Sequence, residues 1–263
     1  MARKPRRHDA DAGGDRQLLE RKAELRTRTW DALSAAKVAR FPGAHHRISN
    51  FVGAEAAAQR LRETEEWAAA RTVKANPDSP QWPVRQRALE DGKVVFMAVP
   101  RLAGDDPFFL LDPDHLADTP RKASSIKGAS ASARTVAVEE LEPVDLVVTG
   151  CVAVSEDGTR LGKGGGFSDL EFALACEAGM IGPDTVIATT VHDLQVLPAG
   201  QIPRTAHDLR VDLVVTPERV LRIPRTQDWS AGRIVWDQLT DDKIAAIPLL
   251  GRLARDRGRP AAQ

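Results

Sequence analysis

Residues 144–174 place a strand-like run, a glycine-rich loop and a helix-like segment in direct succession. The run from Val144 to Val154 is apolar and rich in β-branched side chains, which is typical of a strand buried on both faces of a sheet. Residues 160–166 then hold four glycines and two cations, and Ser168 and Glu171 have the spacing of a helix capping box. This order predicts an α/β fold with the loop between a buried strand and a helix N-terminus.

The glycine loop has the composition of an anion site. Glycines let the backbone bend sharply and leave its N–H groups uncovered, and a concave row of such groups binds anions. A helix N-terminus directly after the loop adds to that preference. The alternative is a glycine-rich surface turn without a ligand, but flexibility alone does not require the cations Arg160 and Lys163. We therefore favour a phosphate site.

The loop differs from the commonest phosphate loops. A Walker loop ends in Gly-Lys followed by Ser or Thr, whereas Lys163 is followed by Gly164, and the dinucleotide fingerprint would need Gly or Ala at Phe167. The stretch resembles instead the signature of the 5-formyltetrahydrofolate cyclo-ligases, also called methenyltetrahydrofolate synthetases. It departs from that signature at the usual pair of tyrosines, which are Phe167 and Ser168 here. The matching positions are Arg160, Gly162, Gly164, Gly166, Phe167 and Asp169.

The resemblance implies ATP and Mg²⁺ as cofactors and catalytic roles for Arg160 and Lys163. The family carries a Lys-x-x-x-Arg pair on its first helix that reaches the nucleotide, and this pair is Lys22 and Arg26 here. Without the resemblance, two cations four residues apart are an ordinary solvated helix face. The implied nucleotide-binding residues are Lys22, Arg26, Arg160, Leu161, Gly162, Lys163, Gly164, Gly165, Gly166, Phe167 and Ser168.

The resemblance also implies ligands for magnesium and for the substrate. It assigns Asp169 and Asp208 to magnesium, and carboxylate oxygens suit a hard ion that also contacts phosphates. Each alone would be an ordinary turn or helix-start residue. The family places a substrate-contacting Glu after its first strand, which we match to Glu55 after a predicted strand at 47–52; the alternative is that Glu55 only complements a helix N-terminus. Phe167 is the second implied substrate contact.

The whole chain fits one domain with loose ends. We predict a flexible tail over 1–15, a cyclo-ligase-like domain over 16–224, and an extension with a loose basic end over 225–263. The domain is expected to be a Rossmann-like three-layer α/β/α fold with a mostly parallel central sheet, an architecture that the resembling family shares. The other expected elements are a helix over 16–36, a strand-loop-helix-strand segment over 71–98, a long irregular loop over 100–135, and strands over 185–191 and 213–216.

The composition limits the expected partners and location. The 37 basic and 37 acidic residues balance, so no global field points to nucleic acid or to a membrane. No apolar run approaches the ~20 residues of a membrane span, and the N-terminus lacks the apolar segment of a secretory signal. The two cysteines lack metal-site spacing, which predicts a reduced, cytoplasmic setting, with Cys151 as a packed residue rather than a nucleophile. The oligomeric state stays open.

Two enzyme hypotheses and one binding hypothesis follow. The resemblance implies ATP-dependent conversion of 5-formyltetrahydrofolate to 5,10-methenyltetrahydrofolate through a phosphorylated formyl intermediate, with a reduced folate as the partner molecule. The segment 73–78 resembles the cyclo-ligase-like paralogues, including the methenyltetrahydrofolate synthetase domain-containing proteins, so the alternative is the same ATP site with another substrate, such as a thiamine-related one. A non-enzymatic, RNA-associated protein is disfavoured because the sequence has no RNA recognition motif and no tyrosine.

Overall fold

The computed structural model describes residues 7–257 apart from 103, 105, 166, 205–207, 226–233 and 235. For residues 7–15, 101, 167–169, 238 and 243, it describes the backbone and not the side chain. The statements below concern the described part of the chain.

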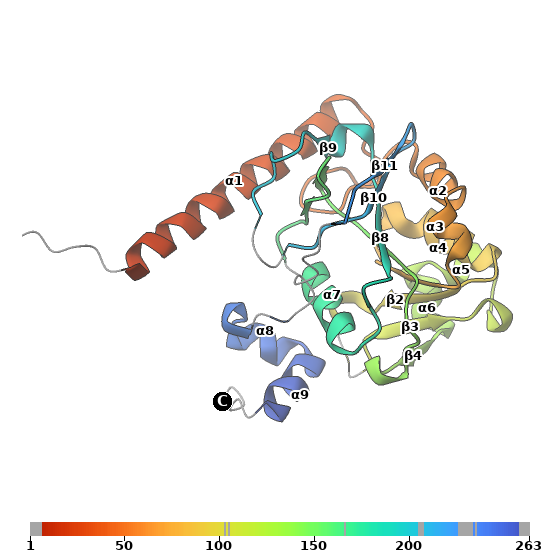
Figure 1. Cartoon of the computed structure of the whole chain (residues 1–263). Helices are drawn as coiled ribbons and strands as arrows, with labels where there is room; N and C mark the ends of the chain where they lie inside the picture. The colour runs from red at the N-terminus through yellow and green to blue at the C-terminus, as the bar shows by residue number, and fades with distance from the viewer. Residues whose placement is uncertain are drawn as a thin grey trace, which may run out of the picture.

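An eight-stranded sheet forms the centre of the protein (Figure 1). Its five inner strands are parallel to one another, and antiparallel strands extend it at both edges. In order across the sheet, the strands are β11 (Val220–Arg222), β10 (Leu213–Val215), β8 (Val186–Thr190), β5 (Leu146–Thr149), β1 (Thr72–Ala75), β2 (Val94–Ala98), β3 (Phe108–Leu111) and β4 (Arg134–Val136).

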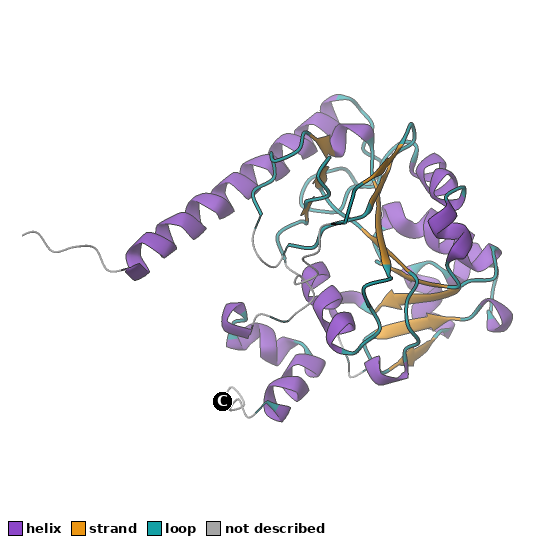
Figure 2. Ribbon diagram, in the orientation of Figure 1, coloured by secondary structure: helices purple, strands orange, loops and turns teal. Residues whose placement is uncertain are grey.

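Helices cover both faces of this sheet (Figure 2). One apolar core joins the sheet to α7 (Phe167–Glu177), α8 (Asp241–Ala246) and α9 (Pro248–Asp256). The other joins the opposite face to α2 (Ala54–Arg62), α3 (Glu65–Ala69), α4 (Trp82–Glu90) and α6 (Ile126–Ser132), with α5 (Pro120–Ala123) packed between α4 and α6. The predicted three-layer fold with a mostly parallel sheet is confirmed. None of the described helices has the length and apolar character needed to cross a bilayer.

A three-stranded sheet and a long helix stand beside the central sheet. The small sheet consists of β7 (Arg160–Leu161), β6 (Ala153–Ser155) and β9 (Val196–Leu197). The helix α1 (Arg7–Ala35) extends away from the body at its N-terminal end (Figure 1). Its Leu25 packs with Leu161 and other apolar residues of the small sheet and its loops. This contact brings α1 to the glycine loop, which directly follows β7.

Three predicted elements differ from the structure. The strand expected at 47–52 is wrong, because Phe51 makes only an isolated bridge to Ala39 and the segment is buried through its side chains. The long loop expected at 100–135 is also wrong, since it contains β3, β4, α5 and α6. Its Pro and Ser residues act as helix starters: Pro120 lies in the first turn of α5, and the Ser125 hydroxyl accepts from Gly128 N at 2.9 Å.

The third difference is a break in the apolar run 144–154. It forms two strands in two different sheets, β5 and β6, instead of one. Both strands are buried, so the residues of each are apolar. The apolar pattern therefore continues through the break and does not mark it. The chain turns between them at Gly150, where a Cβ atom would lie 2.8 Å from both Gln81 Oε1 and Ile48 Cγ2. The helix expected at 16–36 is longer than predicted, since α1 begins at Arg7.

The strand order places a topological switch point between β1 and β5. The chain passes from β1 through α4 to β2 on one side, and from β5 through α7 to β8 on the other. The two connecting helices lie on opposite faces of the sheet, so the loops that follow β1 and β5 diverge at their carboxyl ends. In open α/β sheets, ligands bind in the crevice at such a point.

Gly158 in the turn between β6 and β7 provides a test of this fold. Its φ is 84°, and an added Cβ would lie 2.5 Å from the backbone oxygen of Val211. We therefore expect Gly158→Ala to lower the free energy of unfolding by about 1–3 kcal/mol in urea denaturation. Gly182→Ala is the matched control, because nothing lies within 4 Å of an added Cβ there and its φ is not positive. An equal loss of unfolding free energy in Gly158→Ala and Gly182→Ala would contradict the turn conformation of Gly158.

Candidate active site

The glycine loop follows the β6–β7 hairpin beside the switch point. Arg160 and Leu161 form β7 and are buried, and Arg160 Nη1 donates to the backbone oxygen of Gly150 at 2.8 Å. This bond ties the start of the loop to the carboxyl end of β5. Gly164 has a φ of 104°, a backbone conformation that favours glycine. Gly166 lies outside the described residues.

Helix α1 contributes Arg26 to this loop. Its Nε donates to the backbone oxygen of Gly162 at 2.7 Å. Its guanidinium carbon lies 3.6 Å from the point where a Cβ on Gly164 would stand, so the loop backbone and the cation are in close contact. The side chain of Arg26 therefore faces the loop, as the first-helix prediction requires, although its role toward a nucleotide stays a prediction.

Lys22 lies one turn earlier on α1 and faces Asp208. Its Nζ donates to both carboxylate oxygens of Asp208, at 2.6 and 2.8 Å, and its side chain is buried. The two residues are 186 positions apart in the chain. The structure thus brings the implied nucleotide ligand Lys22 together with the implied magnesium ligand Asp208.

Lys163 differs from the other cations at the site because its side chain is exposed. Neither its ammonium group nor the backbone N–H groups of Lys163 and Gly164 form a hydrogen bond or ion pair with the described residues. Arg160 and Arg26, in contrast, are already bonded to backbone oxygens of Gly150 and Gly162. Lys163 is therefore the loop cation whose charge is directed to solvent.

Helix α7 starts two residues earlier than a capping box with Ser168 as the N-cap predicts. It begins at Phe167, so Ser168 lies within the helix, and Glu171 does not cap it. The carboxylate of Glu171 accepts from Lys74 Nζ on β1 instead, and both side chains are buried. The side chains of Phe167, Ser168 and Asp169 lie outside the described part of the structure.

The loop after β1 forms the other side of the switch point. The half-buried Asp78 directs its Oδ2 atom to within 3.2 Å of an added Cβ on Gly150. Burial raises the pKa of the Asp78 carboxyl, an effect that Glu171 increases and that Lys163, Arg85 and Arg160 oppose. Asp78 therefore lies within the electrostatic reach of the glycine-loop cations. Sequence reasoning noted segment 73–78 but assigned it no site residue.

Glu55 and His192 have structural partners of their own. Glu55 lies on α2 with a half-exposed side chain, and its carboxylate accepts from Arg87 Nη1 on α4 at 2.8 Å. The strand predicted before it is not formed, and its role toward a substrate stays a prediction. His192 follows β8, and its Nδ1 atom accepts from Leu194 N at 3.1 Å.

Two carboxylates, those of Asp169 and Asp208, are the implied magnesium ligands. The structure describes the side chain of Asp208 and not that of Asp169. No group of three or more His, Cys, Asp or Glu among the described residues could hold a metal ion. Asp208 has suitable oxygen donors, and its charge is neutralised by Lys22. Burial raises the pKa of the Cys151 thiol to about 11, which excludes a reactive thiolate at neutral pH and fits the predicted packed residue.

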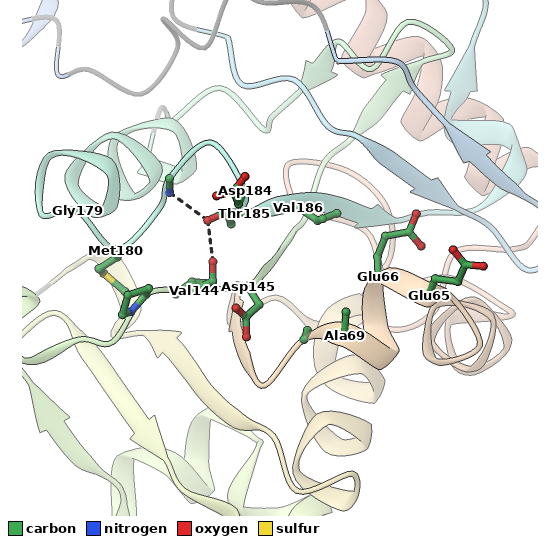
Figure 3. A pocket seen from close by; sticks show the side chains of 13 residues that line it. Glu65, Glu66, Ala69, Val144, Asp145, Gly179, Met180, Asp184, Thr185 and Val186 are labelled. Carbon is green, nitrogen blue, oxygen red and sulfur yellow. Dashed lines mark hydrogen bonds between the residues drawn. The ribbon is translucent and has the colours of Figure 1, made fainter.

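A separate surface pocket lies at the amino ends of the strands, away from this site (Figure 3). Its walls include Asp145 before β5 and Asp184 before β8, together with Glu65 on α3. Inside it, the Thr185 hydroxyl donates to Val144 O at 2.7 Å and accepts from Gly182 N at 3.0 Å. These contacts connect the segments that precede β5 and β8, and they do not identify a ligand for the pocket.

The fold and the glycine loop define an α/β protein with a site at the switch point of its sheet. Residues 18–217 match the 5-formyltetrahydrofolate cyclo-ligase family, and the chain belongs to this family. A solved structure with a similar fold is the NMR structure of Aquifex aeolicus 5,10-methenyltetrahydrofolate synthetase, with a TM-score of 0.51 and 21% identity over 79% of this chain and 95% of that one.

Among curated relatives, the chain is similar to methenyltetrahydrofolate synthase domain-containing proteins. It is 37% identical to that of Mus musculus over 244 residues, which cover 92% of this chain and 65% of the relative. For Bos taurus, the identity is 36% over 234 residues, covering 88% and 61%. The chain therefore spans less than two thirds of these relatives. It is also 35% identical over 92 residues to a protein of Arabidopsis thaliana named "5-formyltetrahydrofolate cyclo-ligase, mitochondrial", covering 33% and 32%.

The buried pair of Lys74 and Glu171 allows a prediction about how α7 is held. Removing one partner leaves an uncompensated buried charge, so Lys74→Met should cost about 3–5 kcal/mol of unfolding free energy. The double variant Lys74→Met/Glu171→Met should recover most of that loss, because two apolar side chains of similar length replace the pair. Urea denaturation of the single and double variants measures both effects.

Glu20→Gln is the surface control for this cycle. Arg16 and Glu20 form an ion pair, and their side chains are 81% and 59% exposed. Breaking this pair should change the free energy of unfolding by less than about 1 kcal/mol. If the double variant loses as much unfolding free energy as Lys74→Met and Glu171→Met together, the two side chains are not coupled.

Proposed function

We propose that the chain is an ATP- and Mg²⁺-dependent 5-formyltetrahydrofolate cyclo-ligase that produces 5,10-methenyltetrahydrofolate. The observation that carries the proposal is the exposed ammonium group of Lys163 beside the unbonded N–H groups of Lys163 and Gly164, among the described residues. They lie at a switch point, where α/β sheets bind ligands. The family of the chain supports the same reaction class.

The phosphates of ATP are proposed to lie along the glycine loop. The ammonium group of Lys163 and the N–H groups of Lys163 and Gly164 would bind them directly, since such donors are strong partners for phosphate oxygens. Arg26 and Arg160 hold the loop in shape through Gly162 O and Gly150 O, and they add positive charge beside it. Phosphoryl transfer depends mainly on such positioning and charge neutralisation.

Magnesium is proposed to bind through Asp208 and Asp169. The ion would neutralise phosphate charge, and it commonly uses one or two carboxylates together with phosphate oxygens. Asp208 fits because both of its carboxylate oxygens face α1, where they accept from Lys22. Its present partner Lys22 would then be released to the phosphates, which fits the nucleotide role that family resemblance implies for Lys22.

In the proposed reaction, the formyl oxygen of the substrate attacks the γ-phosphate. The neighbouring folate nitrogen then closes the ring of the phosphorylated formyl intermediate, and phosphate leaves. The chain requires no covalent nucleophile for these steps, and the buried thiol of Cys151 is consistent with that. The residues of the site would bind and align the two substrates.

A second candidate keeps the ATP site and changes the second substrate. It is favoured by Ser168, which stands where the family usually has a second tyrosine and provides no ring to line a folate-sized pocket. Turnover of 5-formyltetrahydrofolate at low KM, followed by absorbance of the methenyl product, would exclude this candidate. ATP binding without such turnover would favour it.

Lys163→Ala tests the phosphate assignment. Loss of one charged donor should weaken ATP binding about 10- to 100-fold in titration calorimetry with Mg²⁺, and lower the rate on the order of 10²–10³-fold. Lys127→Ala is the control, because Lys127 is an exposed lysine on α6, which covers the other face of the sheet. Unchanged ATP affinity in Lys163→Ala would remove this side chain from the site, and no ATP binding by the wild type would refute the proposed function.

A further inference from the structure

The turn between β6 and β7 is closed by the carboxylate of Asp157. Its Oδ1 atom accepts from the Ser155 hydroxyl at 2.5 Å and from Thr159 N at 2.9 Å. Its Oδ2 atom accepts from Gly200 N, outside the turn, at 2.7 Å. Burial opposes ionisation of this carboxyl, but the hydrogen bonds from Ser155, Thr159 and Gly200 outweigh burial and lower its pKa. Asp157 is therefore an ionised side chain with donors on both of its oxygens.

The same turn is bonded to segment 208–211. Arg210 donates to the backbone oxygen of Asp157 from Nε at 3.2 Å and from Nη2 at 2.6 Å. The backbones also pair, since Val211 N donates to Gly158 O at 2.9 Å. They lie so close that an added Cβ on Gly158 would stand 2.5 Å from Val211 O. One side chain with two hydrogen bonds and direct backbone contact therefore join the turn to this segment.

Two parts of the candidate site extend from this turn. On one side, β7 leads directly to the glycine loop, which begins at Gly162 and contains Lys163. On the other side, the bonded segment begins with the implied magnesium ligand Asp208. The bond to Gly200 adds a point of support on the connection between β9 and Asp208. The proposed phosphate donors and the proposed metal ligand are thus held by one turn.

Magnesium would make strict demands on the distance between these two parts. The ion takes oxygen ligands at about 2.0–2.1 Å in nearly ideal octahedral geometry, and it commonly binds carboxylate and phosphate oxygens together. A shift of about 0.5 Å between the glycine loop and Asp208 is therefore enough to disturb the site. Under the proposed function, Lys22 releases Asp208 when the ion binds, so this contact does not hold Asp208 in the loaded enzyme. The bonds of the turn involve none of the proposed ligands and remain in place.

We propose that Asp157 is a positioning residue, which fixes the glycine loop and Asp208 at the separation that lets Mg²⁺ connect Asp208 to the nucleotide phosphates. The proposal rests on the proposed function, because it takes the phosphate and magnesium sites from there. Asp157 itself contacts neither substrate nor metal. Its loss should reduce the cooperation between Mg²⁺ and nucleotide more than the affinity for the nucleotide alone.

The experiment measures the Kd of a non-hydrolysable ATP analogue by titration calorimetry, once with Mg²⁺ and once with EDTA. The ratio of the two Kd values is the coupling between metal and nucleotide. The variant is Asp157→Ala, which removes all three bonds of the carboxylate.

The matched control is Asp145→Ala. The carboxylate of Asp145 also accepts three hydrogen bonds, from Arg71 N at 2.7 Å, Thr72 N at 3.0 Å and the Thr72 hydroxyl at 3.1 Å. It precedes β5 and so lies at the opposite edge of the sheet from the candidate site. The two variants lose similar bonds, and they differ in distance from the glycine loop.

We expect Asp157→Ala to lower the coupling ratio about 10-fold and to change the Kd in EDTA by less than about threefold. Asp145→Ala should keep the ratio within about twofold of the wild type, even where it lowers the Tm as much as Asp157→Ala does. Equal weakening with Mg²⁺ and with EDTA in Asp157→Ala would overturn the proposal. A fall of the ratio in Asp145→Ala of the same size would also overturn it, because the ratio would then follow stability.

Two further variants decide the question if Asp157→Ala does not fold. Asp157→Asn keeps an oxygen acceptor for Ser155 and Thr159 N and loses the second carboxylate oxygen. Arg210→Met removes the two bonds to Asp157 O and leaves the carboxylate of the turn unchanged. Each should lower the coupling ratio about threefold or more. A ratio within about twofold of the wild type in both variants would overturn the proposal.

Failure of the proposed function would give a different result. If the wild type does not bind the ATP analogue, or binds it equally with Mg²⁺ and with EDTA, the proposed function is refuted and this inference with it. If the wild type binds the analogue more tightly with Mg²⁺ and the Asp157 and Arg210 variants keep its coupling ratio, the inference alone is refuted.

Discussion

The ion pair between Lys74 and Glu171 is the contact on which the geometry of the site depends. It connects β1, one of the two strands at the switch point, to the second turn of α7, the helix that follows the glycine loop. Both charges are buried, and Lys74 also lies over the ring of Phe108 at 5.8 Å. Since an unpaired charge in such a place is costly, the pair restricts α7 to one position against the sheet. The end of the glycine loop is restricted with it.

Contacts between distant parts of the chain complete the arrangement. Arg26 bonds to Gly162 across 136 residues, and Lys22 bonds to Asp208 across 186. Helix α1 lies outside the central sheet and is held there by Leu25 in the small apolar cluster of β6, β7 and β9. The small sheet therefore leads into the glycine loop through β7 and packs against α1 through the same apolar cluster.

Local patterns predicted most of the central fold, and long-range pairing explains the failures. The glycine loop, α7, β8 and β10 have strong local signals and were expected where they occur. The strand predicted at 47–52 is not formed, because Ile48 and Phe51 are buried by side-chain packing and the segment makes only an isolated bridge to Ala39. Glu171 satisfied a capping pattern, but a lysine 97 residues away takes its carboxylate. A local sequence pattern around Glu171 does not include Lys74, so it cannot predict this ion pair.

The sequence change at Ser168 has a consequence for how a second substrate is recognised. Replacing a tyrosine by Ser168 removes a ring with roughly 150–250 Å² of surface to bury. A pocket with less aromatic surface must obtain more of its selectivity from hydrogen bonds, and a site that pairs substrate N–H groups rejects analogues that lack them far more strongly than an apolar pocket does.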